Sequence, residues 1–205
     1  MCGRYYIDLT KDELSFVNNF TEIEYEQNFN VAPQNRAPCI IDNNLVIANW
    51  GYFPDWLKSQ SNPRPLFNTR YESLLEKKTF TSAFKNSRCL IPISGWYEWK
   101  EEDGIKQPYY FFDISESLLF AAGLYWNRSS GDIETSIITR EAVSSLQSIH
   151  NRSPLLLTEK QRELWVSDLS SEEIYSEILD YTYDNIAFHK VDRAVNNPKN
   201  NNDSL

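Results

Sequence analysis

The sequence is poor in the residues that crosslink small proteins or hold metal ions. Its 205 residues include three cysteines and two histidines. The cysteines, Cys2, Cys39 and Cys89, are odd in number and widely spaced, which fits neither a disulfide framework nor a zinc-binding pattern. We therefore expect a protein of a reducing compartment that holds no metal.

Long apolar runs are also missing. No stretch of about 18 apolar residues occurs, so the sequence predicts no membrane-spanning helix. Its first residues contain no apolar signal region. These absences predict a cytoplasmic protein with no membrane partner. Hydrophobic residues nevertheless make up 41% of the chain and aromatic residues 14%, which excludes a disordered protein and predicts a sizeable core.

Internal repeats and low-complexity segments are absent until the C-terminus. The stretch NNPKNNNDSL, residues 196–205, is polar, whereas the Asn- and Pro-containing stretch 59–65 is short enough to be a loop. We expect a single domain over residues 1–197, followed by a polar flexible tail over 198–205. We also expect a monomer.

Helix starts are predicted where Ser or Thr is followed three residues later by Glu or Gln, the capping-box pattern. The pairs that fit are Thr10 with Glu13, Thr69 with Glu72, Thr158 with Gln161, and Ser170 with Glu173. A further helix is expected over residues 141–150.

Hairpins account for much of the remaining chain. Asp103-Gly104 predicts one hairpin turn, and residues 128–132 predict another between runs 118–127 and 133–140. Hairpin-linked strands, with helices set between the groups, indicate an α+β fold. We expect a mostly antiparallel β-sheet curled into a barrel-like core with peripheral helices.

Cys2 follows the initiator methionine directly. Aminopeptidases that trim the initiator prefer a small second side chain, so removal of Met1 would leave Cys2 with a free α-amine and a thiol on adjacent carbons. No internal cysteine has this pair of nucleophiles. The alternative is an ordinary cysteine ahead of a first strand.

The segment GWYEW, residues 95–99, combines large aromatics with a carboxylate. Strand alternation puts Trp96 and Glu98 on one face and Tyr97 and Trp99 on the other. If the face of Glu98 is buried, desolvation raises its pKa toward that of a general acid. The alternative is a structural Glu98 paired with an arginine.

Net charge is −9, which argues against a nucleic-acid partner, but the charge is unevenly distributed. Residues 30–100 hold nine basic and five acidic side chains. An anionic ligand is therefore expected to meet the middle of the chain.

Three further segments each allow a functional and a structural interpretation. Aromatics in residues 50–56 can stack on bases or cover the core. Asn68 and Arg70 flank a predicted helix start, a suitable anion site, although Thr69 and Glu72 would cap that helix in any case. His150 can exchange protons near neutral pH, yet a lone histidine is more often structural.

Together these segments resemble the SRAP family, the SOS-response-associated peptidase-like or abasic-site processing proteins. The resemblance runs in family order from residue 2 to about 197 and is specific as a set. It rests on MCGR (1–4), NVAP (30–33), WGYFPDW (50–56), NTRYE (68–72), RCLIPISGWYEW (88–99), TREA (139–142), HNRSP (150–154) and VDRAVNN (191–197).

The resemblance implies a protein that binds single-stranded DNA containing an abasic site, with no cofactor. The α-amine of processed Cys2 would condense with the ring-opened aldehyde, and the thiol would close a thiazolidine ring. An α-amine has a pKa of about 7.7–8.0, so part of it is unprotonated at neutral pH. Self-removal of Met1 and strand cleavage at abasic sites are further implied activities.

Matching motif positions assign the remaining roles. The implied catalytic set is Cys2, Asn68, Glu98 and His150; the implied DNA-binding set is Arg4, Trp50, Arg70, Trp99 and Arg152.

Two departures lie between these positions. The family usually has alanine where this chain has Thr69, and methionine where it has Ser153. Both changes bear on local packing more than on the chemistry.

Two other functions remain open at this point. An N-terminal-nucleophile amidohydrolase would also use processed Cys2, but the sequence lacks an Asn-Gly pair of the kind that forms an oxyanion hole in such enzymes. A non-catalytic DNA-binding module would leave Cys2, Glu98 and His150 without a common explanation.

Overall fold

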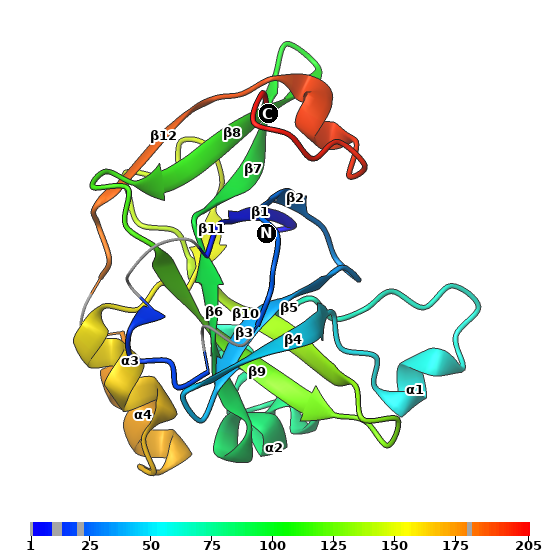
Figure 1. Cartoon of the computed structure of the whole chain (residues 1–205), viewed down its shortest axis with the longest axis vertical. Coiled ribbons are helices and arrows are strands. Elements are labelled where there is room, and N and C mark those ends of the chain that lie inside the picture. The colour runs from blue at the N-terminus through cyan, green and yellow to red at the C-terminus, as the bar shows by residue number, and fades with distance from the viewer. Residues whose placement is uncertain (1, 10–13, 20–22, 180–181) are drawn as a thin grey trace.

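Two β-sheets, built mostly from antiparallel strands, organise the protein (Figure 1). The computed structural model describes residues 2–9, 14–19, 23–179 and 182–205. The strands are β1 (Arg4–Ile7), β2 (Asn28–Val31), β3 (Arg36–Ile41), β4 (Asn44–Trp50), β5 (Asn68–Arg70), β6 (Arg88–Ile93), β7 (Gly95–Glu102), β8 (Ile105–Asp113), β9 (Leu119–Asn127), β10 (Ile133–Glu141), β11 (Arg152–Pro154) and β12 (Ile186–Lys190).

Five of these strands close a barrel. β3 pairs with β4 and β6, β6 with β9, and β9 with β10, all antiparallel, and β10 returns to β4 in a parallel pairing. β5 and β11 extend this sheet along β10. The expected α+β fold with a barrel-like core of mostly antiparallel strands is confirmed.

The second sheet has the order β12-β8-β7-β1-β2. Only Ser94 separates β6 from β7, so one nearly continuous stretch of chain passes from the barrel into the second sheet. In Figure 1, β1 lies between the barrel below and the β7–β8 hairpin above. The start of the chain is thereby held where the two sheets meet.

The two predicted hairpins are present. Asp103 and Gly104 join β7 to β8 with φ values of 51° and 76°, the left-handed conformation that an Asp-Gly turn favours. Residues 128–132 connect β9 to β10, which pair from Ile133 with Asn127 to Ile137 with Gly123.

The helices lie around the barrel (Figure 1). They are α1 (Asp55–Lys58), α2 (Lys78–Asn86), α3 (Glu159–Val166) and α4 (Ser171–Glu177), with 3₁₀ turns η3 (Tyr71–Ser73) and η4 (Arg193–Asn196). The capping boxes predicted at Thr158 and Ser170 are confirmed and start α3 and α4. The pair Thr10 and Glu13 lies outside the described residues. No helix in the described ranges is long and apolar enough to cross a membrane.

Two helix predictions are wrong. Thr69 caps no helix: it lies in β5 beside β10, and its hydroxyl lies 2.9 Å from that of Ser136. Only the short η3 follows, and α2 begins later, at Lys78. In the range 141–150, Glu141 ends β10 and residues 144–149 form turns rather than a helix. At Thr69, pairing with β10 overrides the local helix pattern. After Glu141 the chain turns back so that β11 can pair with β10.

The tail predicted at 198–205 lies against β2. The amide N–H of Phe29 donates to Asn201 Oδ1 at 2.7 Å, and Asn30 Nδ2 donates to the Asn200 carbonyl at 2.9 Å. The C-terminal residues therefore contact the strand that pairs with β1.

Gly95 allows a close approach between β7 and β8. A Cβ added there would lie 2.4 Å from the Phe111 carbonyl oxygen and 2.4 Å from the Tyr110 ring. We predict that Gly95→Ala lowers stability by about 1–3 kcal/mol, the usual cost of overpacking, seen as a lower Tm. Gly104→Asn is the control: the turn is open, and Asn tolerates its positive φ. Equal Tm values for the two variants would contradict the packing explanation.

Candidate active site

Cys2 is held in place by β1. That strand pairs with β7 through Arg4 and Tyr97, and with β2 through Tyr5 and Val31. Cys2 is 0% exposed, and its Sγ lies 3.9 Å from the Arg4 carbonyl oxygen. Burial, together with the negative charge of Glu98, raises the pKa of the thiol. The sulfur is therefore a neutral thiol inside the protein and not an exposed thiolate.

Glu98 lies on the inner face of β7, as the strand alternation predicts. It is 2% exposed, and Trp96 on the same face stacks on Phe111 with ring centroids 4.9 Å apart. Burial raises the pKa of Glu98 to about 7. A carboxyl with that pKa exists in both protonation states near neutral pH, as a general acid or base requires.

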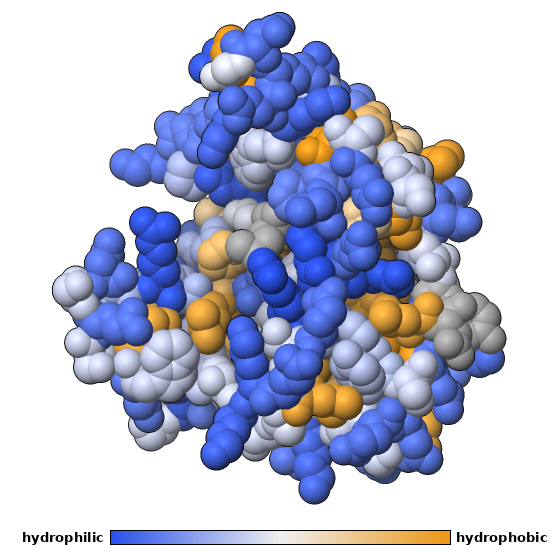
Figure 2. Space-filling view, turned by 180° about the vertical axis from the view of Figure 1, so that it is seen from behind, coloured by the Kyte–Doolittle hydropathy of each residue, from blue (hydrophilic) through white to orange (hydrophobic). Residues whose placement is uncertain are grey.

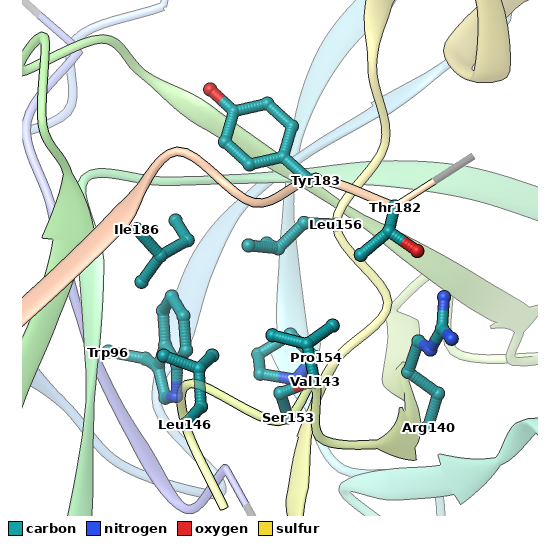
Figure 3. A pocket seen from close by; sticks show the side chains of 10 residues that line it. All are labelled: Trp96, Arg140, Val143, Leu146, Ser153, Pro154, Leu156, Thr182, Tyr183 and Ile186. Atoms are coloured by element: carbon teal, nitrogen blue, oxygen red, sulfur yellow. The ribbon is translucent and has the colours of Figure 1, made fainter.

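Mostly apolar side chains pack behind β7, around a small space. Trp96, Leu146 and Ile186 line one side of a small cavity and Arg140 lies across from them, with Pro154 between (Figure 3). Its volume is about 20 Å³, room for roughly one water molecule. This cavity belongs to the core and is too small for a ligand.

His150 faces the buried carboxyl of Glu98: Nε2 lies 3.8 Å from Glu98 Oε2. The backbone N–H of Arg152 donates to His150 Nδ1 at 3.0 Å. The Arg152 carbonyl oxygen also lies 3.1 Å from Nδ1, so this nitrogen can accept from the N–H or donate to the carbonyl, according to which tautomer the ring adopts. Burial lowers the pKa of His150, which favours the neutral ring. The structural alternative for Glu98, an arginine partner, is replaced here by a histidine.

Asn68 reaches Cys2 from β5. Its Nδ2 donates to the Cys2 carbonyl oxygen at 2.6 Å. Its Oδ1 is buried and has no hydrogen-bond partner among the described residues. The Asn68 amide thus fixes the backbone of Cys2 while keeping one acceptor available beside it.

The predicted DNA-binding arginines have different surroundings. Arg152 forms a two-point ion pair with Glu72, at 2.7 and 3.0 Å, and donates to the Thr139 carbonyl. Arg4 donates to Asn30 Oδ1 and to the Val195 carbonyl. Arg70 is exposed at the end of β5. Arg70 is therefore the most accessible of the three.

The two predicted tryptophans also differ. Trp50 is 1% exposed; it packs edge-on against Tyr5 and donates to the Phe67 carbonyl at 2.9 Å. It supports the residue before Asn68 and has no open face for a base. Trp99 lines an open pocket, and its Nε1 donates to Asn196 Oδ1 at 2.6 Å.

Two open pockets meet at His150. One, of about 440 Å³, is lined by Glu98, Trp99 and His150 together with Arg4, Lys106 and Asn196. The other, of about 420 Å³, is lined by Arg70, Glu141, His150, Asn151 and Arg152. Hydrophilic residues dominate the face of the molecule seen in Figure 2, and apolar patches there are small. No group of three or more His, Cys, Asp or Glu that could hold a metal occurs in the described part of the chain.

The structure thus brings Cys2, Asn68, Glu98 and His150 together from four separate segments. Sequence reasoning missed Asn30, Glu72 and Asn196, which hold Arg4, Arg152 and Trp99. Asn30 and Asn196 lie within the NVAP and VDRAVNN motifs, so a signal was present, but nothing local shows what either side chain contacts.

Comparisons with known proteins agree with this arrangement of residues. A family profile described as "SOS response associated peptidase (SRAP)" matches residues 1–198. The chain is 32% identical to the abasic site processing protein YoqW of Bacillus subtilis, covering 100% of this chain and 98% of that protein. It is 28% identical to the abasic site processing protein YedK of Escherichia coli, with 98% and 96% covered, and 28% identical to the abasic site processing protein HMCES of Mus musculus, with 98% and 74% covered.

Solved structures share the fold. A protein from Bacteroides thetaiotaomicron aligns with a TM-score of 0.71 at 26% identity, covering 81% of this chain and 78% of that one. A phage-related protein from Bordetella bronchiseptica aligns with a TM-score of 0.74 at 22% identity, with 93% and 94% covered. Because the profile spans nearly the whole chain and a relative exceeds 30% identity, this chain belongs to the SRAP family.

Proposed function

We propose that this protein processes abasic sites in single-stranded DNA by forming a covalent thiazolidine link through Cys2. The relatives are named abasic site processing proteins. The observation that carries the proposal is the convergence of Cys2 with a buried carboxyl, a neutral imidazole and an amide acceptor.

The reaction requires a free α-amine on Cys2, so Met1 must leave first. The amine then attacks the aldehyde carbon of the ring-opened sugar, and the carbinolamine loses water to give an imine. The thiol adds to the imine carbon, and its proton ends on the nitrogen. Aldehyde and aminothiol thus give one ring and one water, with no oxidant or cofactor.

Glu98 supplies the proton for sugar opening and for loss of water from the carbinolamine. A carboxyl with a pKa of about 7 is still partly protonated at neutral pH, whereas an exposed glutamate, with a pKa of about 4.3, is not. After donating, the carboxylate can take the proton of the neutral Cys2 thiol as it adds to the imine. The same group therefore serves both halves of the reaction.

His150 and Asn68 assist this proton transfer. His150 Nε2 lies 3.8 Å from Glu98 Oε2, and the tautomer with its proton on Nε2 would stabilise the carboxylate after it has donated. The free Oδ1 of Asn68 accepts from the Cys2 amine or a sugar hydroxyl. Either hydrogen bond would orient the nucleophile relative to the aldehyde.

Two further activities belong to the proposal. Hydrolysis of the Met1–Cys2 peptide bond would use Glu98 to move the proton, so the protein would remove its own initiator. The imine formed before ring closure also permits β-elimination of the 3′ phosphate, which is strand cleavage. Ring closure by the thiol competes with that elimination.

The DNA backbone would follow the two pockets that meet at His150. Arg70 contacts a phosphate, while Lys106 and Trp99 lie on the other side of His150. Arg152 and Arg4 act mainly by holding His150 and the pocket wall, because their guanidinium groups bond to protein atoms. The chain acts as a monomer in this proposal.

Covalent capture is the first test. Processed protein mixed with single-stranded DNA containing one abasic site should give a heat-stable adduct on a denaturing gel. Cys2→Ala should lose that adduct, because an amine alone gives only an imine, which borohydride traps. Cys39→Ala, which removes a buried thiol elsewhere, is the control and should crosslink normally. A heat-stable adduct in Cys2→Ala at the wild-type level would exclude the thiazolidine.

The second test concerns Glu98. Glu98 must be protonated to act as a general acid, and the Cys2 α-amine must be unprotonated to attack. The crosslinking rate should therefore peak between about 7, the pKa of Glu98, and the ~7.7–8.0 of an α-amine, and fall at higher pH. Glu98→Gln should crosslink more slowly, by at most the ~10²–10⁴ typical of acid–base catalysis, and should lose that fall while DNA affinity stays nearly unchanged. Glu101→Gln, an exposed change on the same strand, should behave as wild type. Wild-type rates in Glu98→Gln would make Glu98 structural.

Arg70 is tested by salt. Affinity for single-stranded DNA should fall with added salt, with a slope of ~0.7 per contacted phosphate. Arg70→Ala should flatten the log–log slope by about one such contact. Lys85→Ala, an exposed change in α2, which lies below the barrel in Figure 1, should leave the slope unchanged. If Arg70→Ala also leaves it unchanged, Arg70 does not contact phosphate.

A further inference from the structure

The C-terminal segment, residues 193–201, supplies part of the wall of the open pocket that Glu98 lines, through Asn196. Asn196 lines that pocket together with Trp99 and His150. Trp99 Nε1 donates to the Asn196 side chain, and Arg4 Nη1 donates to the Val195 carbonyl at 2.6 Å. Residues 193–201 lie nearly 200 residues from Cys2 in sequence, so only tertiary contacts place this wall near it.

Asn30 ties this wall to the strands that carry Cys2. It lies in β2 and is 1% exposed. Its Nδ2 lies 3.2, 3.1 and 2.9 Å from the carbonyl oxygens of Val195, Asn197 and Asn200. Its Oδ1 accepts from Arg4 at 2.7 Å. One buried amide thus joins β1 to three carbonyls of the C-terminal segment.

The local backbone of β2 presents Asn30 in this direction. Tyr5 pairs with Val31 and Ile7 with Asn28, so Phe29 and Asn30 together oppose Tyr6, which is a bulge. A bulge bends a strand and redirects a side chain. Asn28 Oδ1 accepts the backbone N–H of Asn30 at 2.9 Å and stabilises the bend.

We propose that Asn30 is a positioning residue that holds residues 193–201 as the wall against which single-stranded DNA beside the abasic site binds. It touches no reacting atom and acts through Arg4 and the C-terminal carbonyls. This inference rests on the proposed function, since it assigns the wall to DNA binding. Only a side chain with both a donor and an acceptor at this position can hold Arg4 and the carbonyls together.

Asn30→Asp tests the donor role of the Asn30 amide separately from its acceptor role. Aspartate has the same shape and still accepts from Arg4, but a carboxylate cannot donate and would face three carbonyl oxygens. The C-terminal segment should therefore loosen while Arg4 keeps its partner. Asn86→Asp makes the same chemical change at an exposed position of α2, and is the control.

The experiment measures binding to single-stranded DNA carrying a tetrahydrofuran in place of the abasic sugar, which has no aldehyde and cannot crosslink. Asn30→Asp should raise Kd about five- to tenfold, the effect of losing about one hydrogen bond's contribution. Hydrogen exchange should accelerate at the amides of Asn197 and Asn200, whose N–H groups bond within the segment. Asn86→Asp should change neither quantity.

Other outcomes overturn the proposal. If Asn30→Asp only lowers the fraction of protein that binds, with the Kd of that fraction unchanged, Asn30 serves folding alone. Faster exchange with an unchanged Kd means that the segment is not a wall for DNA. Unchanged exchange means that Asn30 does not hold it. If the wild-type protein does not crosslink to DNA with a true abasic site, the thiazolidine chemistry is rejected. The binding assay with tetrahydrofuran DNA does not depend on that chemistry, so the two failures can be told apart.

Discussion

A carboxyl group kept away from water is the constraint on which the site depends. Glu98 is buried because it lies on the same face of β7 as Trp96, which stacks on Phe111 in the core. Burial raises the pKa of Glu98 and of the Cys2 thiol and lowers that of His150. Desolvation therefore favours the uncharged form of all three groups.

The two ends of the chain meet at β1 and β2, and this meeting makes the site. β1 brings Cys2 to Glu98 by pairing with β7, while Arg4 on the same strand holds the C-terminal segment. Asn68 arrives from β5 and His150 from the turn after β10, both of them tied to the barrel through β10. A residue near a chain end is normally mobile; here strand pairing on both sides of β1 restrains Cys2.

The sequence predicts the parts of this arrangement that depend on local pattern. Alternation along GWYEW is enough to place Glu98 with Trp96, and the capping boxes at Thr158 and Ser170 start real helices. The same capping pattern starts no helix at Thr69, because β5 pairs with β10 there and the Thr69 hydroxyl hydrogen-bonds to that of Ser136. The helix predicted over residues 141–150 is absent for a similar reason: β10 continues to Glu141, and the chain then turns back toward β11. Propensity is a local quantity, and these segments are decided by distant strands.

Counting charged residues in a sequence has the same limit, because the count does not show what each side chain contacts in the folded protein. The excess of basic residues in positions 30–100 draws attention to Arg70, which is exposed, but a count treats every guanidinium as available. Arg152 is neutralised by Glu72, and Arg88, inside the counted range, donates to the carbonyls of Phe84, Trp165 and Ser167. Arginine has five donors and often satisfies protein carbonyls before any ligand arrives. The number of basic residues in a stretch of sequence is thus the largest number of phosphate contacts that the stretch can make. Each arginine that instead hydrogen-bonds within the protein lowers that number.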